Sequence, residues 1–528
     1  MKNIKVKLIF TPYMQHAYYL PYGLGVLAAF LKDNHIDVTL DDLSIKIEEN
    51  NRQFWFLSEK RINLDILQRE KELIDYLLDS NSNKEFEHLA RNIIQTTSCD
   101  GYDLIGISVK TFQHFRLAML LSREIKSTTN SKVVLGGPLI NIYGKEIFSR
   151  FPIVDYMIIG DGQLPLLQLI EYLEGRIAIE DVPNLIYRQN GGIKSNARKF
   201  FPIEEQDIPY FPEDLIAFYR GGRNKRLVLP YQISRGCAYS CSFCDYKLGN
   251  PFLEFKSHRK VVTEIKEMKE RYQSNAFHFC DDAINCSYEY LDKLCDIILE
   301  DRLGIVWVSY ARADNLDKKI LHKMKKSGCL FLAVSIESGS DRILKDIKKG
   351  FTIQQASSVL QNLHKEGIHN SISILVGYPH ETEEDIAKTV EFIKTHSEYI
   401  DKVRIASLKI TRDTPLYNNP EKFGIENLCP MPNVLHTFFA FDEINGLKWE
   451  EKVKQQRYSY KKILWANFKY ILSKKYRINF VPFWFYFLVK EKLNLFPMDI
   501  FYRLLRLFSA CFIKKVRIQK FNYHRYKI

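Results

Sequence analysis

Three cysteines lie within eight residues of the segment SRGCAYSCSFCDYKLGN, residues 234–250. Cys237, Cys241 and Cys244 have the spacing C-x3-C-x2-C, and three thiolates can bind zinc or an iron–sulfur cluster. A closed structural zinc site needs four ligands, yet no second C-x2-C or His pair follows, and His258 lacks a paired ligand. A [4Fe–4S] cluster on three cysteines leaves one iron open to a cofactor or substrate, which accounts for the missing fourth ligand.

Apolar strands alternating with charged helices surround these cysteines. Strands are predicted in LVLPYQISRG, AFHFCDD, IVWVSYAR, FLAVSIESG, SISILVGYP and VRIASLKI, separated by helices such as KVVTEIKEMKERY. Six such units predict a full or partial (β/α)6 TIM-like barrel over residues 227–424. Active sites in this architecture lie at the C-terminal ends of the strands, and the cysteines directly follow the first strand.

A second α/β unit precedes the barrel. Residues 1–170 alternate short apolar strands with helices, which predicts a Rossmann-like, doubly wound parallel sheet, with a helical insertion at about 45–98. Residues 171–226 form a connecting segment with a predicted hairpin in DVPNLIYRQNGGIK and the Pro-rich stretch FPIEEQDIPYFPEDL. The predicted fold class is α/β.

Residues 425–528 are predicted to be a helical, aromatic and basic region. Residues 451–528 contain 19 Lys and Arg against 3 Asp and Glu, whereas the whole chain carries +13, so residues 1–450 carry −3. Two interpretations stay open: a helical cap on the barrel, or an interfacial element that docks on anionic membrane or an acidic substrate. No nucleic-acid motif accompanies the charge, so no nucleic-acid partner is predicted.

Composition indicates a globular, cytoplasmic protein. Hydrophobic residues make up 46% and charged residues 26% of the chain. No run reaches the roughly 18 apolar residues of a transmembrane helix, and Lys5 and Lys7 interrupt the N-terminal apolar stretch, which indicates a strand rather than a signal peptide. The other seven of the ten cysteines are scattered and are interpreted as small buried hydrophobes rather than disulfides.

The barrel sequence resembles the radical S-adenosylmethionine (SAM) superfamily. The family motif C-x3-C-x-aromatic-C matches the three cysteines with Phe243 as the aromatic residue. The resemblance implies that the open iron chelates the amino and carboxylate groups of SAM and that Phe243 packs near the adenine. It covers about residues 228–415.

Motifs at the other strand ends extend this resemblance. FHFCDDAIN matches the acidic pair near the methionine amino group, YARAD a basic residue, SIESGS a motif with polar contacts to SAM, and ILVGYP a strand whose backbone contacts adenine. One departure is TRDTPLY, where Asp413 replaces the usual Gly and leaves the shape of the last barrel loop open. Besides Phe243, the SAM-binding residues implied are Asp281, Asp282, Arg312, Glu337, Ser338 and Gly377.

The first domain resembles the cobalamin-binding domain found ahead of many radical SAM barrels, over about residues 15–170. The resemblance rests on YGLGVLAAFLKDNHIDVTLDD, VVLGGP and VDYMIIGDGQLPLLQLIEYL, whose GDGQ replaces a family GEGE turn. The alternative is a generic doubly wound domain whose glycines only make turns. The cobalamin-binding residues implied are Ser108, Lys110, Thr111, Phe112, Gly136, Gly137, Gly160 and Gly162.

The family motif that supplies a histidine to cobalt, D-x-H-x-x-G, is missing from this domain. Its absence implies that the lower face of cobalt meets another group. The segment SVKTFQHF is the candidate lining, and its His114 is either a ligand or, as is more common, a surface or helix-cap histidine.

The resemblance implies a cobalamin-dependent radical SAM enzyme. Its cofactors would be a [4Fe–4S] cluster, SAM and cobalamin, with a flavodoxin- or ferredoxin-type electron donor. A 5′-deoxyadenosyl radical would activate an unactivated carbon of a peptide or small natural product, which then takes a methyl group from methylcobalamin. Two alternatives stay open: ring formation, rearrangement or lipid modification without methyl transfer, and an iron–sulfur electron-transfer or sensor protein. The sequence does not identify the substrate.

Overall fold

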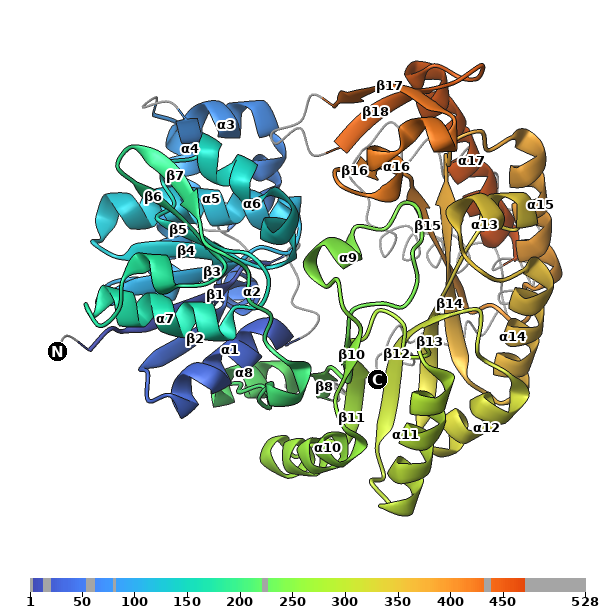
Figure 1. Ribbon diagram of the computed structural model, residues 1–528, viewed down its shortest axis with the longest axis horizontal. Coiled ribbons are helices and arrows are strands. Elements are labelled where there is room, and N and C mark those ends of the chain that lie inside the picture. Colours follow the sequence, from blue (N-terminus) through green and yellow to red (C-terminus); the bar gives the residue numbers. More distant parts are fainter. Residues whose placement is uncertain are drawn as a thin grey trace, which may run out of the picture.

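The computed structural model describes residues 3–12, 20–53, 62–78, 82–220, 227–431 and 438–470. Two α/β units stand next to each other, and a small antiparallel sheet followed by one long helix completes the second unit (Figure 1). Both units contain parallel sheets covered by helices, so the predicted α/β fold class is confirmed.

The first unit contains a seven-stranded sheet of order β2-β1-β3-β4-β5-β6-β7. Its first five strands are parallel, and β6 and β7 form an antiparallel hairpin on β5. The strands are β1 Val6–Phe10, β2 Val38–Asp42, β3 Leu104–Ser108, β4 Lys132–Gly136, β5 Tyr156–Ile158, β6 Leu185–Gln189 and β7 Gly192–Ser195. The predicted hairpin therefore extends the first sheet instead of forming part of a separate connection.

Helices cover both faces of this sheet, because its strands are apolar on both sides. They are α1 Tyr22–Asp33, α5 Phe112–Thr128, α6 Pro138–Arg150 and α7 Gln163–Leu173. The long segment between β2 and β3 is helical as predicted, with α2 Leu43–Gln53, the 3-10 helix η2 Leu64–Gln68, α3 Glu70–Leu78 and α4 Lys84–Thr97. It buries Leu73, Phe86 and Ile93 against α5, so it belongs to the domain core.

The order β2-β1-β3 places a topological switch between β1 and β3. Connections leave these two strands in opposite directions, which opens a crevice outside their carboxyl ends, where ligands of such sheets bind. Thr11 follows β1, and its hydroxyl donates to the carbonyl of Ser108 at the end of β3 over 3.3 Å. The predicted cobalamin residues Ser108, Lys110 and Thr111 thus lie at the expected edge of this sheet.

The second unit is a six-stranded parallel sheet of order β15-β14-β13-β12-β11-β8. The end strands β8 and β15 do not pair with each other, so the barrel is partial. The strands are β8 Val228–Tyr231, β11 Ala276–Phe279, β12 Val306–Arg312, β13 Cys329–Glu337, β14 His369–Val376 and β15 Lys402–Ser407. This arrangement confirms the predicted partial (β/α)6 barrel.

Helices line the outer face of the partial barrel (Figure 1). They are α10 His258–Tyr272, α11 Tyr288–Glu300, α12 Lys318–Lys326, α13 Asp341–Ile347, α14 Ile353–Lys365 and α15 Glu383–Thr395. Outward-pointing residues such as Trp307, Val334 and Ile372 are buried against these helices in one core.

The segment after β15 differs from the prediction of a helical region. Three short strands, β16 Ile410–Thr411, β17 Ile425–Pro430 and β18 Phe438–Glu443, form an antiparallel sheet of order β16-β18-β17 at the barrel mouth. Its strand β18 buries Phe439, Ala440 and Phe441, and its aromatic side chains favour a strand that pairs on both edges. A helical region begins only at α17, Trp449–Tyr470.

Helix α17 packs on the barrel as a cap. Lys452 on α17 donates through Nζ to the carbonyl of Tyr378 over 2.7 Å and pairs with Glu443 at 2.6 Å. Residues 471–528, on which the membrane-docking hypothesis depends, lie outside the described residues, so that hypothesis stays a prediction. Among the described helices, none is long and apolar enough to span a bilayer.

Asp413 resolves the open question about the last barrel loop. Its φ is +62°, in the left-handed region that glycine adopts freely and that Asp tolerates better than most residues. The turn between β16 and α16 Pro415–Asn418 therefore keeps a glycine-like shape without glycine.

Candidate active site

The cysteine loop begins one residue after β9, Ser234–Arg235, near the C-terminal end of β8. Gly236 opens the loop with a φ of +86°, and a Cβ there would lie 1.9 Å from the carbonyl oxygen of Phe252. Only glycine fits this position. Cys237, Cys241 and Cys244 follow as free, partly exposed thiols at the barrel mouth, where the sequence predicted them.

Other strand ends hold this loop in place. The N–H of Ser242 donates to the carbonyl of Ile347 over 2.9 Å, and its hydroxyl lies 2.9 Å from that of Tyr378. The N–H of Leu416 donates back to the Ser242 carbonyl over 3.0 Å. The residue between two of the cysteines is thus fixed to α13, to the loop after β14 and to α16.

Hydrogen-bond donors approach two of the three thiols. A hydrogen bond with Cys286 and another from the N–H of Tyr239 lower the pKa of Cys237 to about 6, although burial opposes them. Arg312 places Nη1 3.5 Å from Sγ of Cys241, and its guanidinium lies 3.4 Å from the centre of the Tyr239 ring. Charge-assisted donors of this kind stabilise cluster thiolates.

Partial burial instead raises the pKa of Cys244 to about 12. In the described part of the chain, no three His, Cys, Asp or Glu side chains converge as ligands of one metal ion would. Cluster cysteines bind different irons and so do not need a common point. Three thiol donors in this spacing fit a cluster.

Cys286 is a residue that the sequence interpretation missed. It was assigned as a small buried hydrophobe, but it is partly exposed and hydrogen-bonds to Cys237. Its position four residues after Asp282, in the loop that follows β11, was the available signal, because strand-end loops of a barrel meet at its mouth.

The two adjacent aspartates after β11 have different environments. Asp281 is fully buried, and its carboxylate accepts hydrogen bonds from the N–H of Ser234 over 2.5 Å and from its hydroxyl over 2.6 Å. Burial raises the pKa of Asp281 to about 6 despite these bonds. Asp282 is exposed at the barrel mouth and hydrogen-bonds to Tyr246. Asp281 thus holds the strand before the cysteine loop, and Asp282 is the carboxylate that a ligand can reach.

A similar division occurs at the end of β13. Glu337 has a φ of +78°, and its carboxylate contacts Lys349 at 3.2 Å and the hydroxyl of Ser373 at 3.3 Å on the inner face. Ser338 is buried, with its hydroxyl 3.4 Å from that of Thr389 on α15. Strained non-glycine backbone of this kind often marks ligand sites, and it occurs here at Glu337.

Phe243 and the loop after β14 come together as the adenine interpretation requires. Phe243 packs in the same apolar cluster as Tyr378, which follows Gly377. Gly377 has a φ of +84°, and its N–H donates to the carboxylate of Glu381 over 2.6 Å. Burial raises the pKa of Glu381 to about 7. A Cβ at Gly377 would lie 2.2 Å from Gln456 of α17, so this backbone position requires glycine.

The predicted cobalamin residues lie along the edge of the first sheet that faces the barrel. Lys110 is exposed and close enough to interact electrostatically with Cys280 and Asp282 after β11. Phe112 instead packs against Phe438 of β18, with ring centres 5.2 Å apart. Lys110 therefore approaches the cluster side of the site, whereas Phe112 joins the domains.

The four glycines of this edge differ in their surroundings. A Cβ at Gly136 would meet only the Ile158 carbonyl, at 3.8 Å, so its backbone is open to a ligand. At Gly137, with a φ of +108°, a Cβ would lie 2.8 Å from the Val109 carbonyl, which gives this glycine a packing reason of its own. The side chain of Arg198 lies beside Gly160, and that of Leu27 lies beside Gly162.

His114 lies in the core beneath this edge. Its ring is buried 5.6 Å from that of Phe10, and its Nδ1 lies 2.8 Å from the hydroxyl of Thr111. Burial lowers its pKa to about 4. This placement fits a histidine that supports the loop at Thr111.

Comparison with known proteins identifies the second unit. Residues 231–393 match the model of the Radical SAM superfamily. They form a radical SAM domain. The matched range begins at the last residue of β8 and contains the cysteine loop, so the predicted superfamily is confirmed. The predicted SAM-binding residues lie within the same range, and their roles stay predictions.

Sequence similarity to curated proteins extends beyond the radical SAM domain. An uncharacterized methyltransferase of Pyrococcus horikoshii is 26% identical over 55% of this chain and 64% of its own length, so the chain spans less than two thirds of that relative. Cytidylyl-2-hydroxyethylphosphonate methyltransferase of Streptomyces wedmorensis is 22% identical over 75% of this chain and 76% of its own length.

Solved structures share the arrangement of both units. The radical SAM methyltransferase TsrM from Kitasatospora setae, solved with cobalamin and a [4Fe–4S] cluster, covers 78% of this chain and 77% of its own at 16% identity, with a TM-score of 0.58. The cobalamin-dependent radical SAM enzyme OxsB, solved with aqua-cobalamin and SAM, covers 88% of this chain and 67% of its own at 17% identity, with a TM-score of 0.63. This similarity establishes the shared fold.

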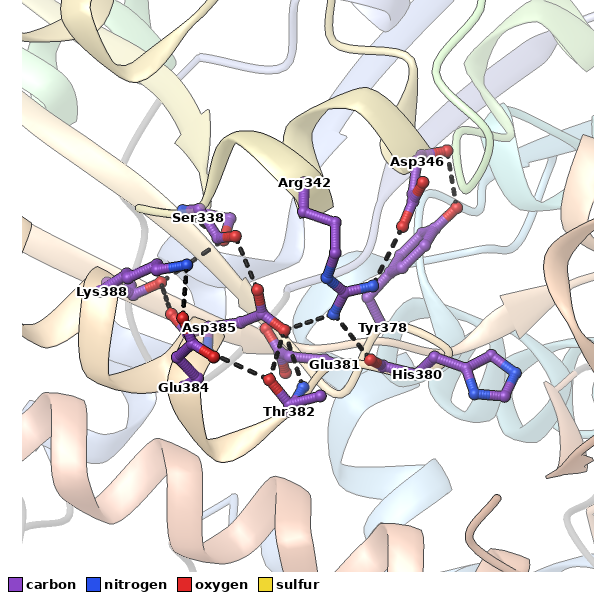
Figure 2. Close-up of polar contacts among 12 residues, drawn as sticks. Ser338, Arg342, Asp346, Tyr378, His380, Glu381, Thr382, Glu384, Asp385 and Lys388 are labelled. Atoms are coloured by element: carbon purple, nitrogen blue, oxygen red, sulfur yellow. Dashed lines mark hydrogen bonds and ion pairs between the residues drawn. The ribbon is translucent and has the colours of Figure 1, made fainter. Parts of the chain in front are cut away.

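A charged network joins two strand-end loops of the radical SAM domain (Figure 2). Asp385 on α15 pairs with Arg342 on α13 and accepts from the hydroxyls of Ser340 at 2.6 Å and Thr382 at 2.7 Å. Arg342 also donates to the carbonyl of His380 over 2.7 Å. The network links the loop after β13 to the loop after β14, and it holds the pKa of Asp385 well below its usual range despite burial.

We expect Asp385→Asn to lower the free energy of unfolding by about 2 kcal/mol at neutral pH, because it removes charge-assisted hydrogen bonds in a buried position. A carboxylate with a depressed pKa stabilises the fold above its unfolded pKa of about 3.9 and loses that effect as the pH falls further. The difference between Asp385→Asn and the wild type should therefore shrink below about pH 4.

Asp346→Asn provides a matched control, because Asp346 contacts the same Arg342 at 3.4 Å from an exposed helix position. Its cost should stay under about 0.5 kcal/mol. Urea unfolding at neutral and acid pH measures both variants. Equal destabilisation by the two substitutions would show that the network does not join the loops as described.

Proposed function

We propose that this chain is a cobalamin-dependent radical SAM enzyme that transfers a methyl group to a carbon of its substrate. The observation that carries this proposal is a juxtaposition: the cysteine loop at the mouth of the partial barrel faces the switch-point edge of the doubly wound domain. Lys110 of that edge lies near Asp282 of the barrel. Two cofactor sites would thus share one space.

Residues of the barrel mouth would hold the first two cofactors. Cys237, Cys241 and Cys244 would bind a [4Fe–4S] cluster, and Arg312 would orient Cys241. SAM would lie between the open iron and the loop after β14, with its amine toward Asp282 and its adenine between Phe243 and the Gly377 backbone. Glu337 would remain the polar contact from β13, and Arg312, Asp281 and Ser338 would act from behind as positioning residues.

The edge of the first domain would hold cobalamin. Gly136 would allow close approach of the ligand, because its backbone is open. The loop of Ser108, Lys110 and Thr111 would line the lower face, and Gly137, Gly160 and Gly162 would shape the turns around the tail. The bound cluster and SAM would supply reductive cleavage of SAM to methionine and a 5′-deoxyadenosyl radical. Bound cobalamin would supply the methyl group for transfer to the substrate.

The protein would supply orientation and exclusion of water. Contacts between the domains enclose the shared space: Arg235 pairs with Asp161 at 2.9 Å, with both side chains mostly buried, and Phe112 packs on Phe438. Radical chemistry needs such enclosure because water and oxygen quench the intermediates. An external one-electron donor of flavodoxin or ferredoxin type would reduce the cluster.

Anaerobic incubation of the reconstituted chain with SAM and dithionite tests this function. We expect 5′-deoxyadenosine and methionine to form, and label from methyl-labelled SAM to appear on protein-bound cobalamin. Formation of 5′-deoxyadenosine without any labelled cobalamin would leave a radical SAM enzyme and remove methyl transfer. Absence of SAM cleavage would contradict the proposal as a whole.

Replacement of Cys237, Cys241 and Cys244 together by Ala should remove the cluster iron and its visible charge-transfer absorbance, because all three protein ligands are lost. Cys286→Ala is the matched control: it removes a thiol that contacts Cys237 but is not one of the three. Iron analysis should give about four irons per chain in that control. Four irons retained by the triple variant would refute the ligand assignment.

Cobalamin should bind without a protein histidine on cobalt. His114 is buried against Phe10 and engaged by Thr111, and its segment lacks the motif that supplies an axial histidine. EPR of the protein in its cob(II)alamin form should therefore show no axial nitrogen splitting, in the wild type and in His114→Ala alike. A nitrogen splitting that disappears in His114→Ala would identify His114 as the ligand.

A further inference from the structure

The inner face of the partial barrel can be read from the strand register. Aligned residues of neighbouring parallel strands point to the same side. Val403 on β15 aligns with Ile372 on β14, and both are buried against the outer helices. Their neighbours in sequence therefore point inward, which places Lys402 and Arg404 of β15 on the inner face.

Two inner rows cross the sheet from β12 to β15. The lower row is Tyr310, Ala333, Ser371 and Lys402, and the upper row is Arg312, Ser335, Ser373 and Arg404. The upper row begins beside the cysteine loop at Arg312 and ends at β15. Three strand spacings of about 4.8 Å separate those two ends, so they lie no more than about 14 Å apart.

Most charges on the inner face are paired. Arg312 contacts Asp314 at 3.0 Å, and Lys349 contacts Glu337 at 3.2 Å. Lys402 and Arg404 are the exception: within the described ranges, neither has a carboxylate at ion-pair distance, and both are exposed. This face of β15 thus presents two cations without a counter-charge.

The two cations are close enough to repel each other. They are two residues apart on one strand, about 6.6 Å along it. Although Lys402 is exposed as a residue, partial loss of water around its ammonium group lowers its pKa, and the positive charge of Arg404 lowers it further. Placing like charges side by side costs free energy, and an anion between them would offset that cost.

Ser371 provides a second observation at the same place. It aligns with Lys402, its side chain is 1% exposed, and its hydroxyl has no hydrogen-bond partner among the described residues. Buried hydroxyls are nearly always paired, so an exception needs an explanation. A ligand oxygen would satisfy it. Protection of the open sheet edge by inward-pointing charges explains lysine on an edge strand, but it does not explain an unpaired buried hydroxyl on the neighbouring strand.

We propose that Lys402, Arg404 and Ser371 bind an oxyanion group of the substrate, a phosphate, phosphonate or carboxylate. The inference rests on the proposed function, because it assigns these residues to that enzyme's substrate. Arg404 offers planar paired donors that match such a group, and Lys402 adds a point charge. The anion on β15 would hold the substrate across the barrel from the cysteine loop, so that a carbon remote from the anion faces the reactive centre.

The test uses the full chain loaded with cluster, cobalamin and SAM, so that the other anion-binding positions are filled. Isothermal titration calorimetry at low salt measures the affinity of inorganic phosphate and, separately, of acetate. We expect Lys402→Gln/Arg404→Gln to weaken binding of the preferred anion at least tenfold. The charge-retaining Lys402→Arg/Arg404→Lys should recover part of that loss. Tighter binding of phosphate would indicate a phosphate or phosphonate on the substrate, and tighter binding of acetate would indicate a carboxylate.

Arg259→Gln/Lys365→Gln is the matched control, since it removes the same two charges from exposed positions on the outer helices α10 and α14. It should bind the anion as the wild type does. Equal weakening in this control would mean that net charge alone attracts the probe. Unchanged affinity in Lys402→Gln/Arg404→Gln, or no anion binding by the wild type, would overturn the proposal. Thermal unfolding checks that all variants are folded.

Affinity for SAM, measured on the cluster-loaded chain without phosphate, separates substrate from cofactor. A tenfold loss of SAM affinity in Lys402→Gln/Arg404→Gln would show that these cations serve the SAM carboxylate, which contradicts the proposal. Failure of the proposed function has a different signature: the wild type would form no 5′-deoxyadenosine, whereas its anion affinity would still depend on Lys402 and Arg404.

Discussion

Hydrogen bonds from other strand ends position the loop that carries the three cysteines. Between Gly236 and Asn250 the only regular element is the four-residue helix α9, Tyr246–Gly249, so neighbouring segments must supply most of the support. Ser242 takes it from Ile347, Tyr378 and Leu416, and Arg312 adds its guanidinium against Tyr239 and Cys241. A loop fixed in this way presents its thiols without a fourth protein ligand to complete their geometry.

The same supports are themselves fixed by polar networks. Tyr378 follows Gly377, whose N–H donates to the carboxylate of Glu381. The carbonyl of Tyr378 accepts a hydrogen bond from Lys452 of α17. Helix α17 is thus connected to the cysteine loop through two hydrogen bonds, one from Lys452 to the carbonyl of Tyr378 and one between the hydroxyls of Tyr378 and Ser242. This explains why a helix so far along the chain is part of the radical SAM unit: it stabilises the loop after β14, which both contacts the cysteine loop and forms the proposed adenine site.

Sequence patterns predicted the parts of this arrangement that depend on periodicity and spacing. The βα units, the helical insertion and the hairpin followed from apolar periodicity, and the cysteine motif identified the superfamily. What spacing does not report is which of two adjacent side chains points inward. Asp281 and Asp282 are neighbours, yet one is fixed to Ser234 and the other is exposed, because successive residues of an extended chain point to opposite sides. The same parity turns Ser338 to the side opposite Glu337, where its hydroxyl lies near that of Thr389.

Contacts between residues far apart in the chain could not be predicted from the sequence either. Cys286 contacts Cys237 only because two strand-end loops meet, and the strands β17 and β18 form only because β18 pairs with both β16 and β17. Local pattern carries no information on such partners. Asp413, by contrast, adopts a positive φ of the kind that glycine adopts freely, because its side chain tolerates that conformation.

The distribution of roles around the barrel narrows where substrate recognition can lie. The ends of β8, β11, β12 and β13 are committed to the cysteine loop or to the charged groups around it, and the loop after β14 packs on Phe243. Among the residues that the structure describes, β15 is the strand whose inner-face charges have no such commitment. Residues 1–450 together carry −3, so the general charge of this part of the chain does not account for two neighbouring cations there. Their position is therefore a local feature of β15, a barrel strand to which none of the proposed cofactor contacts is assigned.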